Sequence, residues 1–130
     1  MRRTHVQAIG TAVPIHHAPQ LDVAQWARQV AESQFDDERD AKRAGAAVER
    51  IYRNSAIHRR SSVVADFVAE PPEFGFFPPN WRLDPEPTTG ARMELYRREA
   101  PPLAHEAAER CLARAPHVAR SGVSHLIVVT

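Results

Sequence analysis

The sequence predicts an α/β fold, in which helices cover a sheet of parallel strands. Two runs of residues predict strands, one at about residues 4–10 and one at residues 123–130. The second run is rich in β-branched apolar residues, which is typical of a strand buried on both faces of a parallel sheet. Between them, three stretches repeat apolar residues every three or four positions, as amphipathic helices do.

The first two helices are predicted between residues 22 and 55. Asp22 is of a type that caps helices, and the apolar positions after it recur at helical spacing. The second helix is predicted to start at Phe35, to cross the acidic run at residues 36–40 and to end at Asn54 and Ser55. Its apolar face comprises Ala41, Ala44, Val48, Ile51 and Tyr52. A loop precedes the first helix, and residues 57–60 fit a short extended piece.

The segment at about residues 70–87 combines prolines with large aromatic residues. This composition predicts a loop held by aromatic packing, because prolines disfavour regular structure and flexible linkers lack bulky rings. A third helix is predicted from Thr88 or Thr89. Pro101 and Pro102 are expected to break it near Ala100, because a proline pair removes backbone donors and clashes with the preceding turn.

The final apolar run bears on the extent of the fold. A strand buried on both faces needs neighbouring strands and helices, and the sequence predicts one other strand, near the N-terminus. We therefore expect residues 1–130 to be one N-terminal portion of a larger α/β domain, truncated after a central strand. The alternative is a complete small domain that covers this strand by dimerising.

Composition excludes several classes of function. The chain has 130 residues and a formal net charge of +1, which gives no argument for binding nucleic acid or an anionic membrane. No apolar run approaches the roughly 18 residues that a membrane span needs. The single cysteine, Cys111, rules out an internal disulfide and a multi-cysteine metal site. A cytoplasmic location is the expectation.

Few residues suit catalysis, and the arginines suit anion binding. Cys111 shares a helical stripe with apolar residues, so we interpret it as a small hydrophobic residue. The seven histidines show no metal-binding spacing, and no glycine-rich phosphate loop occurs. Arg50 and Arg53 share a helix face, and Arg59 and Arg60 follow shortly. Arginine binds phosphate by bidentate donation, whereas the alternative is a solvated basic face.

Four segments carry a resemblance to a known family. They are Ala8 to Pro14 with Gln20 shortly after, Glu49 to Arg60, Thr88 to Ala108, and Val123 to Thr130. In their order and spacing they resemble the N-terminal region of type III polyketide synthases, the chalcone and stilbene synthase family, and its bacterial branch in particular. The resemblance implies a partial thiolase-like fold (its N-terminal βα portion) and a homodimer when full length. It also implies an acyltransferase that condenses malonyl-CoA units onto an acyl-CoA starter, with no tightly bound cofactor.

The resemblance assigns binding residues and no catalytic ones. Arg50 matches a family arginine that contacts the phosphates of CoA. Asn54 stands where plant members have a CoA-contacting lysine, with Arg53 beside it as a substitute. The family's catalytic cysteine, histidine and asparagine match nothing in residues 1–130, so we expect this chain to be inactive alone. The alternatives are another condensing enzyme, such as a ketoacyl synthase, and a non-catalytic truncated or dimerising module.

Overall fold

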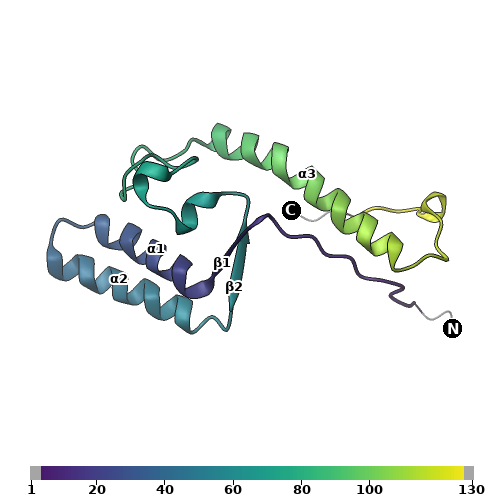
Figure 1. Cartoon of the computed structure of the whole chain (residues 1–130), viewed down its shortest axis with the longest axis horizontal. Coiled ribbons are helices and arrows are strands. Elements are labelled where there is room, and N and C mark those ends of the chain that lie inside the picture. The colour runs from purple at the N-terminus through teal and green to yellow at the C-terminus, as the bar shows by residue number, and fades with distance from the viewer. Residues whose placement is uncertain (1–3, 128–130) are drawn as a thin grey trace. The chain divides into compact units, whose positions relative to one another are not determined.

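A computed structural model describes residues 4–127 of the chain (Figure 1). Three α-helices, two short strands and three short 3₁₀ turns make up its regular structure within that range. The helices and strands are α1 (Gln20–Ser33), α2 (Glu38–Arg53), α3 (Thr89–Ala113), β1 (His16–Pro19) and β2 (Arg59–Ser62). The architecture is thus mixed helix and strand, with a two-stranded antiparallel sheet where a parallel sheet was predicted.

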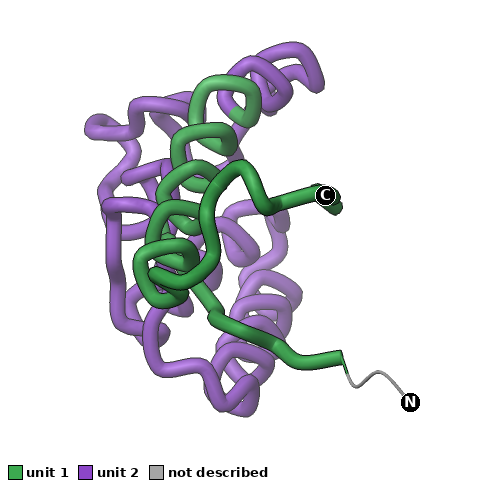
Figure 2. The backbone as a smooth tube through the Cα atoms, turned by 90° about the vertical axis from the view of Figure 1, so that its right-hand side faces the viewer, with its two compact units in different colours: residues 1–13, 96–130 green, residues 14–95 purple. Residues whose placement is uncertain are grey.

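The chain divides into two compact units (Figure 2). Unit 2 comprises residues 14–95 and holds α1, α2 and the sheet. Unit 1 combines residues 1–13 with residues 96–130, so it joins the two ends of the sequence. The helix α3 continues through the division at residue 95.

α1 begins three residues earlier than predicted, with Pro19 and not Asp22 at the N-cap position. The helix starts at Gln20, and Asp22 lies in its first turn instead of capping it. The backbone N–H of Gln20 donates to the carbonyl of His58 at 2.9 Å, so a contact distant in sequence fixes the start of the helix. Val23 and Trp26 follow the predicted helical spacing and are buried on the inner face of α1, as is Ala24.

α2 packs along α1 and has a well-defined beginning and end (Figure 1). It begins at Glu38 and not at Phe35, because the carboxylate of Asp37 accepts from the backbone N–H groups of Arg39 and Asp40, each at 3.0 Å. This is a typical N-cap arrangement. The predicted end at Asn54 is confirmed. Ile51, predicted on the apolar face, is instead 66% exposed.

β1 and β2 pair in antiparallel register and lie beside one end of the α1–α2 pair (Figure 1). His16 lies opposite Ser62, and Pro19 lies opposite Arg59. β2 overlaps the extended piece predicted at residues 57–60, but it begins and ends two residues later. β1 falls within the predicted loop, because its partner lies more than forty residues further along the chain and local sequence does not reveal it.

The strand predicted at residues 4–10 is wrong, because the described part of this run pairs with no strand. Its carbonyl groups accept hydrogen bonds from side chains of α3 and the residue after it. The Sγ of Cys111 donates to Ala8 at 3.5 Å, and Arg114 donates to Ile9 at 2.7 Å. A helix edge therefore satisfies backbone groups that a neighbouring strand was expected to satisfy.

The predicted break in α3 is also wrong. The helix runs from Thr89 to Ala113 without interruption, with Pro101 and Pro102 inside it. Proline has no backbone N–H, so the carbonyl groups one turn earlier in the helix lose their donors. Both prolines are exposed, so water can donate to these carbonyl groups instead. The usual penalty of an interior proline is therefore reduced at this position.

The apolar run at the end of the sequence forms no strand over residues 123–127. Leu126 and Ile127 are 84% and 86% exposed, so these side chains are not covered as a central strand would be. No strand pairs with them among residues 4–127. The remainder of the predicted strand, residues 128–130, lies outside the described residues.

The core of unit 2 is aromatic. The ring of Trp26 lies 4.9 Å from that of Phe67 and 5.8 Å from that of Phe77, measured between centroids. Phe74 also contacts both tryptophans, Trp26 and Trp81. The proline-rich loop thus contributes rings that pack on α1. Across residues 4–127, the helices are too short or too polar to cross a membrane.

Candidate functional site

The three residues assigned to CoA lie together at the C-terminal end of α2. Arg50 and Arg53 occupy its last turn, and Asn54 is the residue that ends it. All three are exposed. Arginines at this end of a helix interact favourably with the helix dipole, so part of their role is to stabilise α2.

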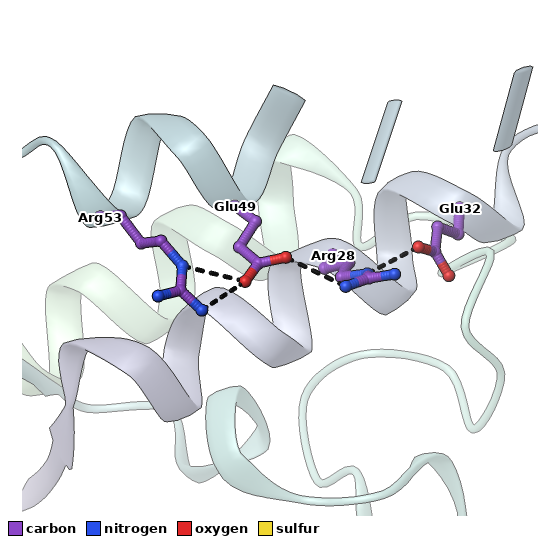
Figure 3. A network of polar contacts seen from close by, with 4 residues as sticks. All are labelled: Arg28, Glu32, Glu49 and Arg53. Atoms are coloured by element: carbon purple, nitrogen blue, oxygen red, sulfur yellow. Dashed lines mark hydrogen bonds and ion pairs between the residues drawn. The ribbon is translucent and has the colours of Figure 1, made fainter. Parts of the chain in front are cut away.

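Arg53 belongs to a chain of ion pairs that joins α1 to α2 (Figure 3). Its guanidinium donates to one carboxylate oxygen of Glu49 from two nitrogens, at 3.0 and 2.6 Å. The other oxygen of Glu49 accepts from Arg28 at 3.0 Å, and Arg28 also donates to Glu32 at 2.7 Å. Arg53 is therefore engaged with a carboxylate, and a phosphate must compete for it.

The electrostatics of this network follow from its hydrogen bonds. The pKa of Glu49 lies below its ordinary value, chiefly because Arg53 donates to the charged carboxylate; partial burial opposes this effect. The pKa of Arg28 is raised, chiefly by its hydrogen bond to Glu32. Both shifts favour the charged forms of Glu49 and Arg28, and the carboxylate of Glu49 lies between two guanidinium groups.

Arg50 differs from Arg53 in having no carboxylate beside it. Within residues 4–127, the guanidinium of Arg50 forms no ion pair and no side-chain hydrogen bond. The amide of Asn54 is likewise without a side-chain partner in that range. Of the three assigned residues, Arg50 therefore offers a charged group that is available to a ligand, and Asn54 offers a neutral one.

The arginines of β2 have contrasting environments. Arg60 donates from Nε to the side-chain oxygen of Gln20 at 2.7 Å, and its guanidinium lies 5.1 Å above the ring of Tyr52. Arg59 is exposed and has no side-chain partner in the described part of the chain. Arg60 is thus held in place, whereas Arg59 is available to a ligand.

Gln20 organises this corner of unit 2 and was not singled out as a functional residue from the sequence. It is buried, and its amide donates to the backbone oxygen of Tyr52 at 3.2 Å and to the hydroxyl of Ser55 at 2.8 Å. Because its oxygen accepts from Arg60, one side chain connects the starts of α1 and β2 to the end of α2. No local pattern distinguishes such a glutamine from an exposed one.

A cavity of about 510 Å³ opens beside this corner. Its walls come from β1, β2, the end of α2, the first turns of α1 and the 3₁₀ turn Ala65–Val68. Tyr52, Arg59 and Arg60 line it, whereas Arg50, Arg53 and Asn54 do not. The sequence alone gave no indication of it, because five separate segments are needed to form it.

Cys111 lies in unit 1 and is partly buried. Its Sγ donates to the backbone carbonyl of Ala8 at 3.5 Å. This environment agrees with the interpretation of Cys111 as a packing residue. Over residues 4–127, no group of three histidine, cysteine or acidic side chains is arranged to hold a metal ion.

Comparison with known proteins assigns neither a family nor a fold to the chain. No family model, no curated protein and no solved structure matches it. A proposal of function must therefore rest on the residues described above and on the resemblance of the sequence segments.

Proposed function

We propose that this chain is the N-terminal portion of an acyltransferase of the type III polyketide synthase class. Such an enzyme condenses malonyl-CoA units onto an acyl-CoA starter, and we propose a thiolase-like fold and a homodimer for the full-length protein. The order and spacing of the four resembling segments support this proposal. The structural observation that carries it is Arg50, an exposed and unpaired arginine at the position where the family binds the phosphates of CoA.

The chemistry of CoA suits this end of α2. CoA carries several phosphate charges, and a guanidinium binds phosphate through two parallel hydrogen bonds. Arg50 can make such a contact without first breaking an ion pair, whereas Arg53 must leave Glu49. The amide of Asn54 can donate one neutral hydrogen bond to the same group. We therefore propose Arg50 as the main phosphate contact, with Asn54 and Arg53 as secondary ones.

The proposal assigns this chain a binding role. Condensation in this class requires a cysteine that carries the growing acyl chain, and Cys111 does not match its position. We propose that the chain binds CoA thioesters and does not condense them by itself. The single cysteine, which allows no internal disulfide, agrees with a cytoplasmic location.

One observation favours a second candidate function, a non-catalytic module that associates with a partner. Leu126 and Ile127 are 84% and 86% exposed and adjacent, which is unusual for large apolar side chains. Covering them would stabilise an association without any catalytic residue. Loss of CoA binding would leave this candidate as the better explanation of the chain.

The test is the affinity of the 130-residue chain for CoA, measured by calorimetry for Arg50→Ala and for the matched control Arg43→Ala. Arg43 is also exposed on α2, seven residues earlier and therefore near the same face. Loss of one charge-assisted contact predicts that R50A binds CoA about tenfold more weakly. The control should bind like the unaltered chain. Equal affinities for the unaltered chain and R50A, or no CoA binding by either, would contradict the proposal.

A further inference from the structure

We propose that the cavity beside β2 is a second binding site, for a small organic anion with an apolar body, such as an aryl carboxylate. The site is separate from the proposed CoA contacts, since Arg50, Arg53 and Asn54 do not line it. The inference does not depend on the proposed function. It rests on the charge, the walls and the pre-organisation of the cavity.

The arginine and carboxylate residues that line the cavity are unequal in number, and arginines are in excess. Arg59 and Arg60 both line the cavity, and none of the residues that line it is an aspartate or a glutamate. The chain as a whole is close to neutral, with a net charge of +1, so this imbalance is local. Two carboxylates are adjacent in sequence to lining residues: Asp66 accepts from the backbone N–H groups of residues 75–77, and Asp22 is exposed and does not line the cavity. The lining therefore favours an anion.

Arg60 is already fixed in position. Its Nε is bonded to Gln20 at 2.7 Å, and its guanidinium lies over the ring of Tyr52. Gln20 is itself buried and bonded to Tyr52 and Ser55, so it cannot easily turn away. A ligand that meets Arg60 thus avoids much of the entropic cost of ordering a long side chain. The side chain of Arg59 forms no hydrogen bond with the described residues, so it can move to bind the same anion.

The remaining walls suit an apolar body. Val23, Ile57, Phe67 and Val68 line the cavity from three different segments, and Tyr52 contributes an aromatic ring. Cavities that bind small molecules typically enclose about 300–1,000 Å³ and combine apolar walls with a few fixed polar groups. The volume of about 510 Å³ falls in that range. A two-ring aromatic acid is an appropriate size for it.

The hydroxyl and imidazole groups at the strands add further hydrogen-bonding capacity. The Nδ1 of His17 and the Oγ of Ser61 lie 2.9 Å apart across the β1–β2 pair, and both residues line the cavity. This contact orients the ring and leaves its Nε2 for a ligand. A carboxylate held by Arg59 and Arg60 can therefore receive a further donor from the neighbouring strand when His17 carries a proton on Nε2.

The experiment compares two fluorescent probes, 2-naphthoate and its uncharged analogue 2-naphthamide, titrated into the 130-residue chain. We expect saturable binding of one equivalent, with the naphthoate bound about tenfold more tightly because only it engages the arginines. Arg59→Ala should reduce this advantage, because Arg60 alone then holds the carboxylate, and should leave the affinity for 2-naphthamide unchanged. Arg59 is exposed, so its replacement is not expected to disturb folding.

Two control variants test whether the loss of affinity for 2-naphthoate is specific to the arginines of the cavity. Arg43→Ala removes an exposed arginine that does not line the cavity, and Arg50→Ala removes the proposed CoA contact; both should bind 2-naphthoate like the unaltered chain. Backbone amide NMR signals of residues 59–62 should shift on titration. The proposal is overturned by equal affinities for the two probes, by an equal loss in R43A and R59A, or by shifts confined to other segments. Because R50A tests CoA and R59A tests naphthoate, failure of one proposal is distinguishable from failure of the other.

Discussion

Asp66 is the clearest case in which one side chain determines the conformation of a loop. It is 2% exposed, and its carboxylate accepts from the backbone N–H groups of Gly75, Phe76 and Phe77 at 2.9, 2.9 and 2.8 Å. These hydrogen bonds set the path of the loop that places Phe77 against Trp26. A buried charge is tolerated here because three donors solvate it.

Replacing Asp66 should therefore destabilise unit 2. Asp66→Asn turns one acceptor into a donor that faces N–H groups, and Asp66→Ala leaves all three N–H groups without an acceptor. We expect losses of about 2 kcal/mol and about 3 kcal/mol in the free energy of unfolding, measured with urea. Glu70→Gln, an exposed change nearby, should stay within about 0.5 kcal/mol. A D66A chain as stable as the E70Q chain would show that the loop does not depend on this carboxylate.

At the scale of elements, the pair formed by α1 and α2 shows what the sequence could predict. The positions of Arg50 and Arg53 on one helix end followed from their spacing of three, and the end of α2 at Asn54 was also predicted. The pair that Arg53 forms with Glu49 is also local, since the two residues are four apart on α2, whereas the contact of Glu49 with Arg28, 21 residues away on another helix, cannot be predicted from spacing. Local spacing reveals which side chains share a face, and does not reveal what packs against that face.

The elements that were predicted wrongly share a second cause. The start of α1, the strand β1 and the conformation of residues 4–10 all depend on hydrogen bonds to distant segments. A short run of residues is compatible with several backbone conformations, and tertiary partners select among them. The cavity is hidden from sequence analysis for the same reason, since its walls come from five segments.

The ion-pair chain between α1 and α2 gives a pH-dependent prediction. The pKa of Glu49 is lowered in the folded chain, chiefly by Arg53, so its contribution to stability is present above the ordinary glutamate pKa of about 4.3. That contribution is lost as the pH falls through the lower, folded-state value. We expect the free energy of unfolding in urea to be lower for Glu49→Gln than for the unaltered chain at pH 7. This difference in free energy should be smaller at pH 3.

Glu70→Gln provides the matched control for this measurement. Glu70 is exposed, and its side chain forms no hydrogen bond or ion pair with the described residues. Its replacement should give a difference in stability that is small at pH 7 and does not change on acidification. If the difference in free energy of unfolding between E49Q and the unaltered chain also did not change with pH, Glu49 would not couple the two helices through its charge.

At the scale of the whole molecule, unit 1 depends on contact between the two ends of the sequence. Gly10 lies so close to α3 that an added Cβ would be 2.2 Å from the carbonyl oxygen of Ala107 and 2.4 Å from the backbone nitrogen of Cys111. These are backbone atoms, which cannot rotate aside as a flexible side chain can. Hydrogen bonds from Arg110 to Thr11 and from Arg114 to Ile9 follow on either side of Gly10. The absence of a side chain at Gly10 therefore permits a contact across about 100 residues of chain.

Gly10→Ala should consequently separate the N-terminal segment from the second half of α3. Overpacking of this kind costs about 1–3 kcal/mol, so amide hydrogen exchange around Cys111 should accelerate by roughly tenfold or more. Gly122→Ala is the control, because Gly122 is in the same unit and an added Cβ there meets nothing within 4 Å. Unchanged exchange at residues 107–113 in G10A would mean that residues 4–13 do not pack on α3 in solution. Equal acceleration in both variants would point to a general loss of order in unit 1 and not to this contact.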